Sequence, residues 1–245
     1  MVVEIFNGCC LEKLKSIDKK FDAIITDPPY GISYKTNHRK NALGKKDKHH
    51  KFAKTIKNDS DLSFLDGFVD DCYKLLNDNS PFYCFCSWKT FDIFKGAIEK
   101  KFDVKNAIIW DKGNWTAGDL YACYANKYEV IIYATKGRVL LDNGRDSDIF
   151  QFNRVPSQNL VHQNQKPVEL IDYLLSKHSK IKSVIDPFMG SCSTGVACLQ
   201  RDINFFGCEI DKEYYNVAKA RIDCTIKEIR GDIFTHTKSI EVIEL

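Results

Sequence analysis

Residues 182–209 read KSVIDPFMGSCSTGVACLQRDINFFGCE, and this stretch decides the fold class. Its apolar runs predict strands at 183–186 and 204–209, and the small and apolar residues between them predict a helix at 194–201. A turn that contains glycine and serine joins the first strand to the helix, and such a turn lets a ligand approach the backbone closely. A strand, a helix and a strand in this order indicate parallel strands with a crossover helix.

The rest of the chain repeats this alternation. Further strands are predicted at 2–6, 21–27, 82–87, 107–111 and 129–135, and further helices at 62–76, 91–101, 167–176 and 213–222. The runs FDAIITD and KSVIDPF are apolar almost throughout, as central parallel strands are. We therefore expect an α/β protein with a mostly parallel, seven-stranded sheet and helices on both faces. The final run, IEVIEL, fits either a short strand or a loose tail.

Composition favours one soluble domain. The chain has 245 residues, of which 44% are hydrophobic and 28% charged. It has no apolar run of about 18–20 residues, the length that a membrane span needs, and its first residues do not resemble a signal peptide. We therefore expect an intracellular, cytoplasmic protein with no membrane partner. The ten cysteines form no CxxC pair, which favours reduced, mostly buried thiols over a metal site.

Charge is concentrated in one segment. Residues 35–57 hold nine Lys or Arg and one acid, whereas the formal net charge of the whole chain is only +3. A basic block on a mildly acidic body predicts contact with a polyanion, although a solvated loop without a partner explains it equally well. In the first case, the candidate contacts are Arg39, Lys40, Lys45, Lys46, Lys48 and Lys51.

The tetrapeptide Asp27-Pro28-Pro29-Tyr30 directly follows the apolar strand at 21–27. Ligands of open α/β sheets lie beyond the carboxyl ends of strands, which is where this tetrapeptide is placed. The Asp27 carboxylate and the Pro28 carbonyl can each accept a hydrogen bond from an exocyclic amine, and the prolines hold these acceptors in direction. Tyr30 offers a face on which a base can stack. The alternative is an ordinary strand that ends in a proline turn.

The turn after the strand at 183–186 is the second candidate site. Its backbone and the start of the following helix can hold polar ligand atoms, although Ser193 or Thr194 can equally cap that helix. Glu209 ends the next strand, where an acid typically binds ribose hydroxyls. A third run, His162 to Pro167, opens a helix, and its Lys166 can neutralise a ligand carboxylate. A plain surface helix start explains this third run equally well.

Together the three runs resemble the family of DNA N6-adenine and N4-cytosine methyltransferases, in the β group with its permuted motif order. The resemblance extends from about Ile5 to Ala220 and includes IIWDKGNW and NKYEVIIYATKGR. It implies a Rossmann-like fold, S-adenosylmethionine as cofactor, double-stranded DNA as partner and a homodimer. The compact size is similar to that of phage or prophage enzymes, which implies a prokaryotic or phage-infected cell, and the family often serves restriction–modification. The resemblance also implies that residues 35–60 are a DNA-contacting insert and that residues 136–160 form a short target-recognition region.

Site residues follow from the same resemblance, position by position. The target base is implied to contact Asp27, Pro28, Pro29 and Tyr30. The cofactor is implied to contact Cys9, Lys166, Asp186, Pro187, Phe188, Gly190, Ser191, Thr194 and Glu209, with Lys166 near its carboxylate and Glu209 at its ribose. Two positions depart from the family pattern, because Cys192 replaces the second glycine of GSG and Cys9 replaces an acid. We expect weaker cofactor binding as a result.

The leading hypothesis is a site-specific DNA methyltransferase that modifies N6 of a flipped adenine, because Asp27 rather than serine favours adenine. The alternatives are an N4-cytosine methyltransferase and a catalytically inactive DNA-binding relative. Modification of RNA or of protein amides is a further possibility, since related tetrapeptides bind other planar amines. The basic insert favours nucleic acid over protein.

Overall fold

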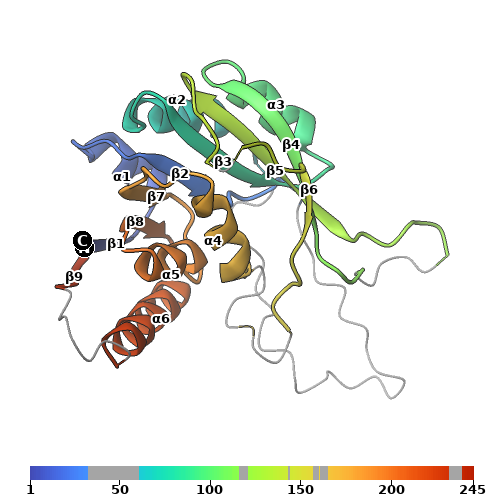
Figure 1. Cartoon of the computed structure of the whole chain (residues 1–245). Helices are drawn as coiled ribbons and strands as arrows, with labels where there is room; N and C mark the ends of the chain where they lie inside the picture. Colours follow the sequence, from blue (N-terminus) through green and yellow to red (C-terminus); the bar gives the residue numbers. More distant parts are fainter. Residues whose placement is uncertain (33–60, 116–120, 143, 157–159, 161–164, 232–238) are drawn as a thin grey trace.

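The computed structural model describes residues 1–32, 61–115, 121–142, 144–156, 160, 165–231 and 239–245 (Figure 1). Its strands are β1 (Val2–Asn7), β2 (Ala23–Thr26), β3 (Ser80–Cys86), β4 (Asp103–Asp111), β5 (Tyr128–Lys136), β6 (Ile149–Gln151), β7 (Ser183–Asp186), β8 (Asn204–Glu209) and β9 (Glu241–Glu244). Its helices are α1 (Cys10–Lys13), the 3-10 turn η1 (Leu14–Ser16), α2 (Leu65–Leu75), α3 (Phe91–Ile98), α4 (Val168–Ser176), α5 (Ser193–Gln200) and α6 (Lys212–Gly231).

All the described strands form one sheet, in the order β6-β4-β5-β3-β2-β7-β8-β1-β9. Strand β5 runs antiparallel to both of its neighbours, β3 and β4, and the remaining strand pairs are parallel. The expected α/β class and the mostly parallel sheet are therefore confirmed.

The expected count of seven strands is wrong, because the described part of the sheet has nine. The additional strands are β6 and β9, and each lies at one edge of the sheet. Strand β6 has only three residues, too few to show an alternation of apolar and polar positions. Strand β9 is a four-residue strand with exposed ends, and it forms by parallel pairing with β1. Both strands depend on a neighbour distant in sequence, which no local pattern reports.

Helix α6 is longer than the predicted helix at 213–222. It continues to Gly231, and Ile222 and Ile226 continue its buried face at a spacing of four residues. The short helix α1, which directly follows β1, was not predicted. Four residues are too few to show a helical period.

Helices cover both faces of the sheet (Figure 1). Helices α4, α5 and α6 pack on one face, where Leu170, Ala197 and Ile222 join the side chains of alternate strand residues. Helices α1, α2 and α3 pack on the other face, where Phe68 and Phe94 are fully buried. Because both faces are covered, the central strands are buried at every position and mostly apolar: all four residues of β2 and all seven of β3 are buried.

Candidate active site

The tetrapeptide Asp27–Tyr30 and the turn that begins at Asp186 lie at the ends of two neighbouring strands. Strands β2 and β7 pair in parallel, with Ala23 opposite Val184 and Ile24 opposite Ile185. The carboxyl ends of these strands therefore meet at one edge of the sheet, and they place Asp27 and Asp186 in the lining of a single cavity. This cavity has a volume of about 600 Å³, within the range of small-molecule sites.

Every residue that the sequence predicted for base or cofactor contact lines this cavity. These residues are Cys9, Asp27, Pro28, Pro29, Tyr30, Lys166, Asp186, Pro187, Phe188, Gly190, Ser191, Thr194 and Glu209. Their individual roles stay predictions. The predicted DNA contacts Arg39, Lys40, Lys45, Lys46, Lys48 and Lys51 lie outside the described residues.

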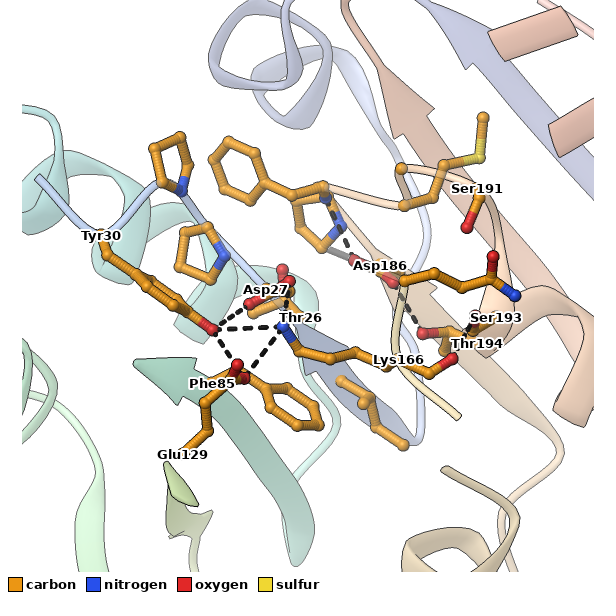
Figure 2. Close-up of a pocket in the computed structure, with 18 of the residues that line it drawn as sticks. Thr26, Asp27, Tyr30, Phe85, Glu129, Lys166, Asp186, Ser191, Ser193 and Thr194 are labelled. Atoms are coloured by element: carbon orange, nitrogen blue, oxygen red, sulfur yellow. Dashed lines mark hydrogen bonds and ion pairs between the residues drawn. The ribbon is translucent and has the colours of Figure 1, made fainter. Parts of the chain in front are cut away.

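Asp27 is the centre of a polar cluster at the end of β2 (Figure 2). The Tyr30 hydroxyl donates a hydrogen bond to Asp27 Oδ1 at 2.5 Å, and Lys166 Nζ donates one to Asp27 Oδ2 at 2.6 Å. Lys166 Nζ also lies 3.3 Å from the Tyr30 hydroxyl. The sequence assigned Lys166 to a cofactor carboxylate, whereas the structure pairs its ammonium with the carboxylate of the tetrapeptide.

Glu129 completes this cluster, and the sequence did not single it out as a site residue. Its Oε2 lies 3.1 Å from Lys166 Nζ, and its Oε1 accepts a hydrogen bond from Lys112 Nζ. Glu129 lies near the start of β5, whereas the cavity lies at the edge where the parallel strands end. It reaches that edge because β5 is antiparallel, with Val130 opposite Cys86 near the end of β3. A lone acid before the apolar run VIIYAT was the available signal.

Burial and the neighbouring ammonium groups set the protonation of the cluster. Burial raises the pKa of Asp27, Lys166 opposes this shift, and the Glu129 charge adds to it. Burial also acts to raise the pKa of Glu129, but Lys166 and Lys112 outweigh it and hold that pKa at about 2. Burial acts to lower the pKa of Lys166, but the two carboxylates hold it above its ordinary value. The Lys166 ammonium group therefore lies between the carboxyl groups of Asp27 and Glu129.

Asp186 organises the other half of the cavity. It accepts hydrogen bonds from the Thr194 hydroxyl at 2.7 Å and from the Phe188 backbone N–H at 3.1 Å. These bonds join the end of β7 to the start of α5. Burial raises the pKa of Asp186 to about 7, although both hydrogen bonds act in the opposite direction. The aromatic ring of Phe188 packs edge-on against that of Phe68, with centroids 5.3 Å apart, and so anchors the turn on the α2 side.

The turn between β7 and α5 has two residues in the left-handed region. Gly190 has φ +51° and Cys192 has φ +66°, and the Cys192 position is the one at which the family pattern has glycine. The Cys192 side chain is nevertheless fully buried, so a thiol is accommodated. Arg221 of α6 holds the turn from behind by donating hydrogen bonds to the Ser191 carbonyl at 2.6 Å and to the Ser191 hydroxyl at 3.1 Å.

Glu209 closes the far end of the cavity, at the end of β8. Its backbone carbonyl accepts hydrogen bonds from the Gly8 N–H at 3.0 Å and from the Asn7 side-chain amide at 2.9 Å, so the end of β1 is held against it. Its Oε1 accepts a bond from the Asp211 N–H at 2.7 Å. Cys9, where the family pattern has an acid, is half-buried and lines the same end.

Three further observations concern the cysteines, metal sites and membrane-spanning helices. All ten cysteines are free thiols, and eight of them are wholly or partly buried. Within the described ranges, no cluster of His, Cys, Asp or Glu has the arrangement of a metal site. No helix among the residues that the structure describes is both long and apolar enough to cross a membrane.

Comparison with known proteins places this geometry among nucleic-acid-modifying enzymes. A family model described as DNA methylase (N6_N4_Mtase) matches residues 21–220, which include every motif discussed above except the segment around Cys9. The type II methyltransferase M2.MboI of Moraxella bovis is 26% identical over 235 residues, covering 89% of this chain and 86% of that protein. The DNA adenine methyltransferase YhdJ of Escherichia coli K12 is 24% identical, covering 89% of this chain and 82% of its own.

Solved structures agree with this placement. The M1.HpyAVI–SAM complex superposes with a TM-score of 0.69 at 25% identity, covering 90% of this chain and 99% of that one. The expected Rossmann-like methyltransferase fold is thereby confirmed.

Proposed function

The chain belongs to the DNA methylase family, and from this premise we propose that it transfers a methyl group from S-adenosylmethionine to N6 of an adenine flipped out of double-stranded DNA. The observation that carries the proposal is the meeting of two motifs in one cavity. The tetrapeptide that begins at Asp27 and the turn that begins at Asp186 end adjacent parallel strands. An amine acceptor and a methyl donor would thus be held side by side at the sheet edge.

The tetrapeptide supplies what amine activation needs. Asp27 and the Pro28 carbonyl would accept the two N–H bonds of the target amine, which draws its lone pair out of conjugation with the ring. That nitrogen then attacks the methyl carbon, so an N–C bond forms while the S–C bond breaks and sulfur keeps the electron pair. The proton that the methylated nitrogen loses would pass to its hydrogen-bond acceptor, the Asp27 carboxylate, and from there to solvent. No covalent enzyme intermediate is required, and catalysis depends on position and electrostatics.

The other half of the cavity fits the polar ends of S-adenosylmethionine. Asp186 and Glu209 bring carboxylate oxygens to the ends of β7 and β8, which suit an ammonium group and ribose hydroxyls respectively. Gly190 has no side chain and a left-handed backbone, so a ligand can lie against the turn. Pro187, Phe188, Ser191, Thr194 and Cys9 would line the same half.

Adenine is the proposed base because an acid, Asp27, opens the tetrapeptide and because one relative is named an adenine methyltransferase. The name of the family model joins N6 and N4, so cytosine N4 is the alternative outcome. The names of the type II relatives further support a role in restriction–modification. An origin in a phage and a homodimeric state stay predictions.

We also propose that one catalytic domain spans residues 1–245, with the insert 35–60 on the phosphate backbone and the segment 136–160 near the bases. The insert carries the excess positive charge of the chain, and phosphate contacts position a protein without reading sequence. Neutralising its lysines would weaken binding to all DNA sequences about equally and flatten the salt dependence of affinity.

The experiment is a methylation assay with purified protein, S-adenosylmethionine and unmethylated double-stranded DNA, in which product nucleosides are resolved by mass spectrometry. We expect N6-methyladenine. Asp27→Asn and Asp27→Ala should lower kcat by roughly 10²-fold or more, because the lost acceptor acts mainly in the transition state. Cofactor affinity should stay within a few-fold, and Asp223→Asn, on the exposed face of α6, is the control.

Other products would redirect the proposal. N4-methylcytosine alone would reverse the base, and an absence of modified nucleosides would leave a DNA-binding relative without activity. Full activity of Asp27→Ala would remove Asp27 from the mechanism.

A further inference from the structure

The ammonium group of Lys166 is surrounded by protein acceptors. Its Nζ lies 2.6 Å from Asp27 Oδ2, 3.1 Å from Glu129 Oε2 and 3.3 Å from the Tyr30 hydroxyl (Figure 2). It also lies 5.0 Å from the centroid of the Phe85 ring, within cation–π range. The side chain is only 9% exposed, so few positions remain from which it could reach another anion.

The backbone fixes Lys166 from the opposite side. Its carbonyl accepts a hydrogen bond from the Ser193 hydroxyl at 2.7 Å, which attaches it to the first residue of α5. Pro167 follows and caps α4, with φ −61° and an extended ψ. Lys166 therefore extends from the junction of two helices, on the cofactor side, across to the end of β2. Its backbone lies beside α5 in one half of the cavity, and its ammonium group lies beside Asp27 in the other half.

Charges alternate along this cluster. Lys112 pairs with Glu129, Glu129 pairs with Lys166, and Lys166 pairs with Asp27. Each of these side chains is less than one quarter exposed. In such surroundings an unpaired charge is costly, so each ion depends on the presence of the next.

We propose that Lys166 is a positioning residue for Asp27, which it holds ionised and in a fixed orientation, and that Glu129 with Lys112 holds Lys166 in place. This inference rests on the proposed methyl transfer, and it replaces a role for Lys166 at the cofactor carboxylate. Each carboxylate oxygen has two lone pairs, so the bonds from Tyr30 and Lys166 leave Asp27 able to accept from the target amine. The contact with Lys166 thus orients the Asp27 carboxylate and leaves lone pairs available for the target amine.

Several ionisable groups face Asp27 from the surrounding elements. They are Tyr30 in the same loop, Cys84 and Cys86 on β3, Glu129 on β5, Asp186 on β7 and Lys166 before α4. Of the described groups in direct contact with Asp27, Lys166 carries the positive charge, and Lys112 lies one ion pair further away, on Glu129. Burial raises the pKa of Asp27, Lys166 counteracts this shift, and Glu129 reinforces it. Removing Lys166 should therefore raise that pKa further, whereas neutralising Glu129 should lower it.

The test compares Lys166→Met with Glu129→Gln across pH. Asp27 must be ionised to accept from the amine, so activity is lost as pH falls through its pKa. Lys166→Met should move the acid limb of kcat upward by about one pH unit or more, the size of an ion-pair effect. Glu129→Gln should move the same limb downward. A purely structural role would not produce shifts of opposite sign.

The cofactor provides the second readout. With Lys166→Met, the dissociation constant for S-adenosylmethionine, measured by calorimetry, should stay within about threefold of wild type while kcat falls about tenfold or more on the acid limb. Lys177→Met is the matched control, because Lys177 pairs with Asp146 at 2.6 Å at the other end of α4. A cofactor constant raised more than about tenfold with an unmoved limb would return Lys166 to the cofactor carboxylate and overturn the proposal.

A third measurement does not require activity. The Asp27 carboxyl carbon, labelled with ¹³C and assigned with Asp27→Asn, can be titrated by NMR in the free protein. Its titration should move upward in Lys166→Met and downward in Glu129→Gln, and identical titrations in both variants and wild type would refute the proposal. If Lys166→Met does not fold, the titration of Asp27 in Glu129→Gln alone tests the proposal. A wild-type protein that makes no methylated base would defeat the proposed function, while the titration would still judge Lys166.

Discussion

Asp186 shows at the residue scale how a functional carboxylate costs stability. It is 4% exposed, and burial raises its pKa to about 7 from an ordinary value of 3.8. Between these values the folded protein binds a proton that the unfolded chain has released. The free energy of unfolding must therefore fall as pH rises through that window, and it levels off above it. A bound ammonium group would favour the ionised form of Asp186 and so offset this loss of stability. Such an effect is expected of a site that binds a positively charged ligand.

Asp186→Asn should remove this pH dependence. We expect the variant to gain about 1–3 kcal/mol in unfolding free energy relative to wild type between pH 5 and pH 8, since each pKa unit is worth about 1.4 kcal/mol. Urea unfolding of the ligand-free protein at both pH values measures it. Asp223→Asn, an exposed site, should show no such gain. A difference that does not change with pH would mean that Asp186 is ionised in the folded protein at pH 5 as well.

Glu209 is the residue at which cofactor affinity should respond most directly. Glu209→Ala would remove the proposed charge-assisted hydrogen bonds to the ribose, so the cofactor should bind more weakly by about 1–3 kcal/mol. Calorimetric titration with S-adenosylmethionine measures this loss. Glu228→Ala, an exposed acid on α6, is the control. Equal affinity of Glu209→Ala and wild type would place the ribose elsewhere in the cavity.

At the element scale, the start of α5 is held in an unusual backbone conformation. Cys192 is its N-cap and has φ +66°, ψ +39°, a left-handed conformation that disfavours any residue with a Cβ. Two contacts maintain it: the Cys192 N–H donates to the Met189 carbonyl at 2.7 Å, and Arg221 holds the neighbouring Ser191. The helix start thus keeps the geometry that glycine usually provides.

Two substitutions at this cap separate backbone strain from packing. Cys192→Ala and Cys192→Gly both remove the buried sulfur, but only glycine relieves the strain. We expect Cys192→Gly to be more stable than Cys192→Ala by about 1 kcal/mol in urea unfolding. At Ala197, inside the same helix, alanine should be preferred over glycine. Ala197→Gly should therefore lower the free energy of unfolding by about 0.5–1 kcal/mol or more. Equal stability of the two Cys192 variants would mean that the turn relaxes away from the left-handed conformation.

At the scale of the whole molecule, the position of Asp27 inside the cavity constrains how a DNA base can reach it. Asp27 lies at the sheet edge with its side chain 23% exposed, inside a cavity shared with the predicted cofactor contacts. An amine that is still paired in a duplex could not reach it. The exposed rings of Trp88 and Tyr128 also line this cavity and offer flat surfaces at its entrance.

We therefore predict base flipping. DNA with 2-aminopurine at the target position should become more fluorescent when the protein binds, because the base leaves the stack. The same probe one base pair away should stay quenched. If the target-position probe stays quenched in a complex that methylates normal DNA, the duplex must enter the site in another way.

Local sequence patterns were sufficient to predict which residues end strands and carry polar groups. Asp27, Asp186 and Glu209 each follow or end a short apolar run, and such runs report strand ends locally. The α/β class followed from the same alternation. The edge strand β6 was not predicted, and β9 was left open between a short strand and a tail, because short strands are defined by their partners rather than by their own residues.

Only the tertiary structure decided which polar groups meet. Strands β2 and β7 are far apart in sequence, and their pairing brings the two halves of the cavity together. The antiparallel direction of β5 carries Glu129 to the edge where parallel strands end, and thereby gives Lys166 its second carboxylate. Strand direction and strand order depend on contacts across the whole sheet. Local periodicity contains neither, and so the partner of Lys166 could not be inferred from the sequence.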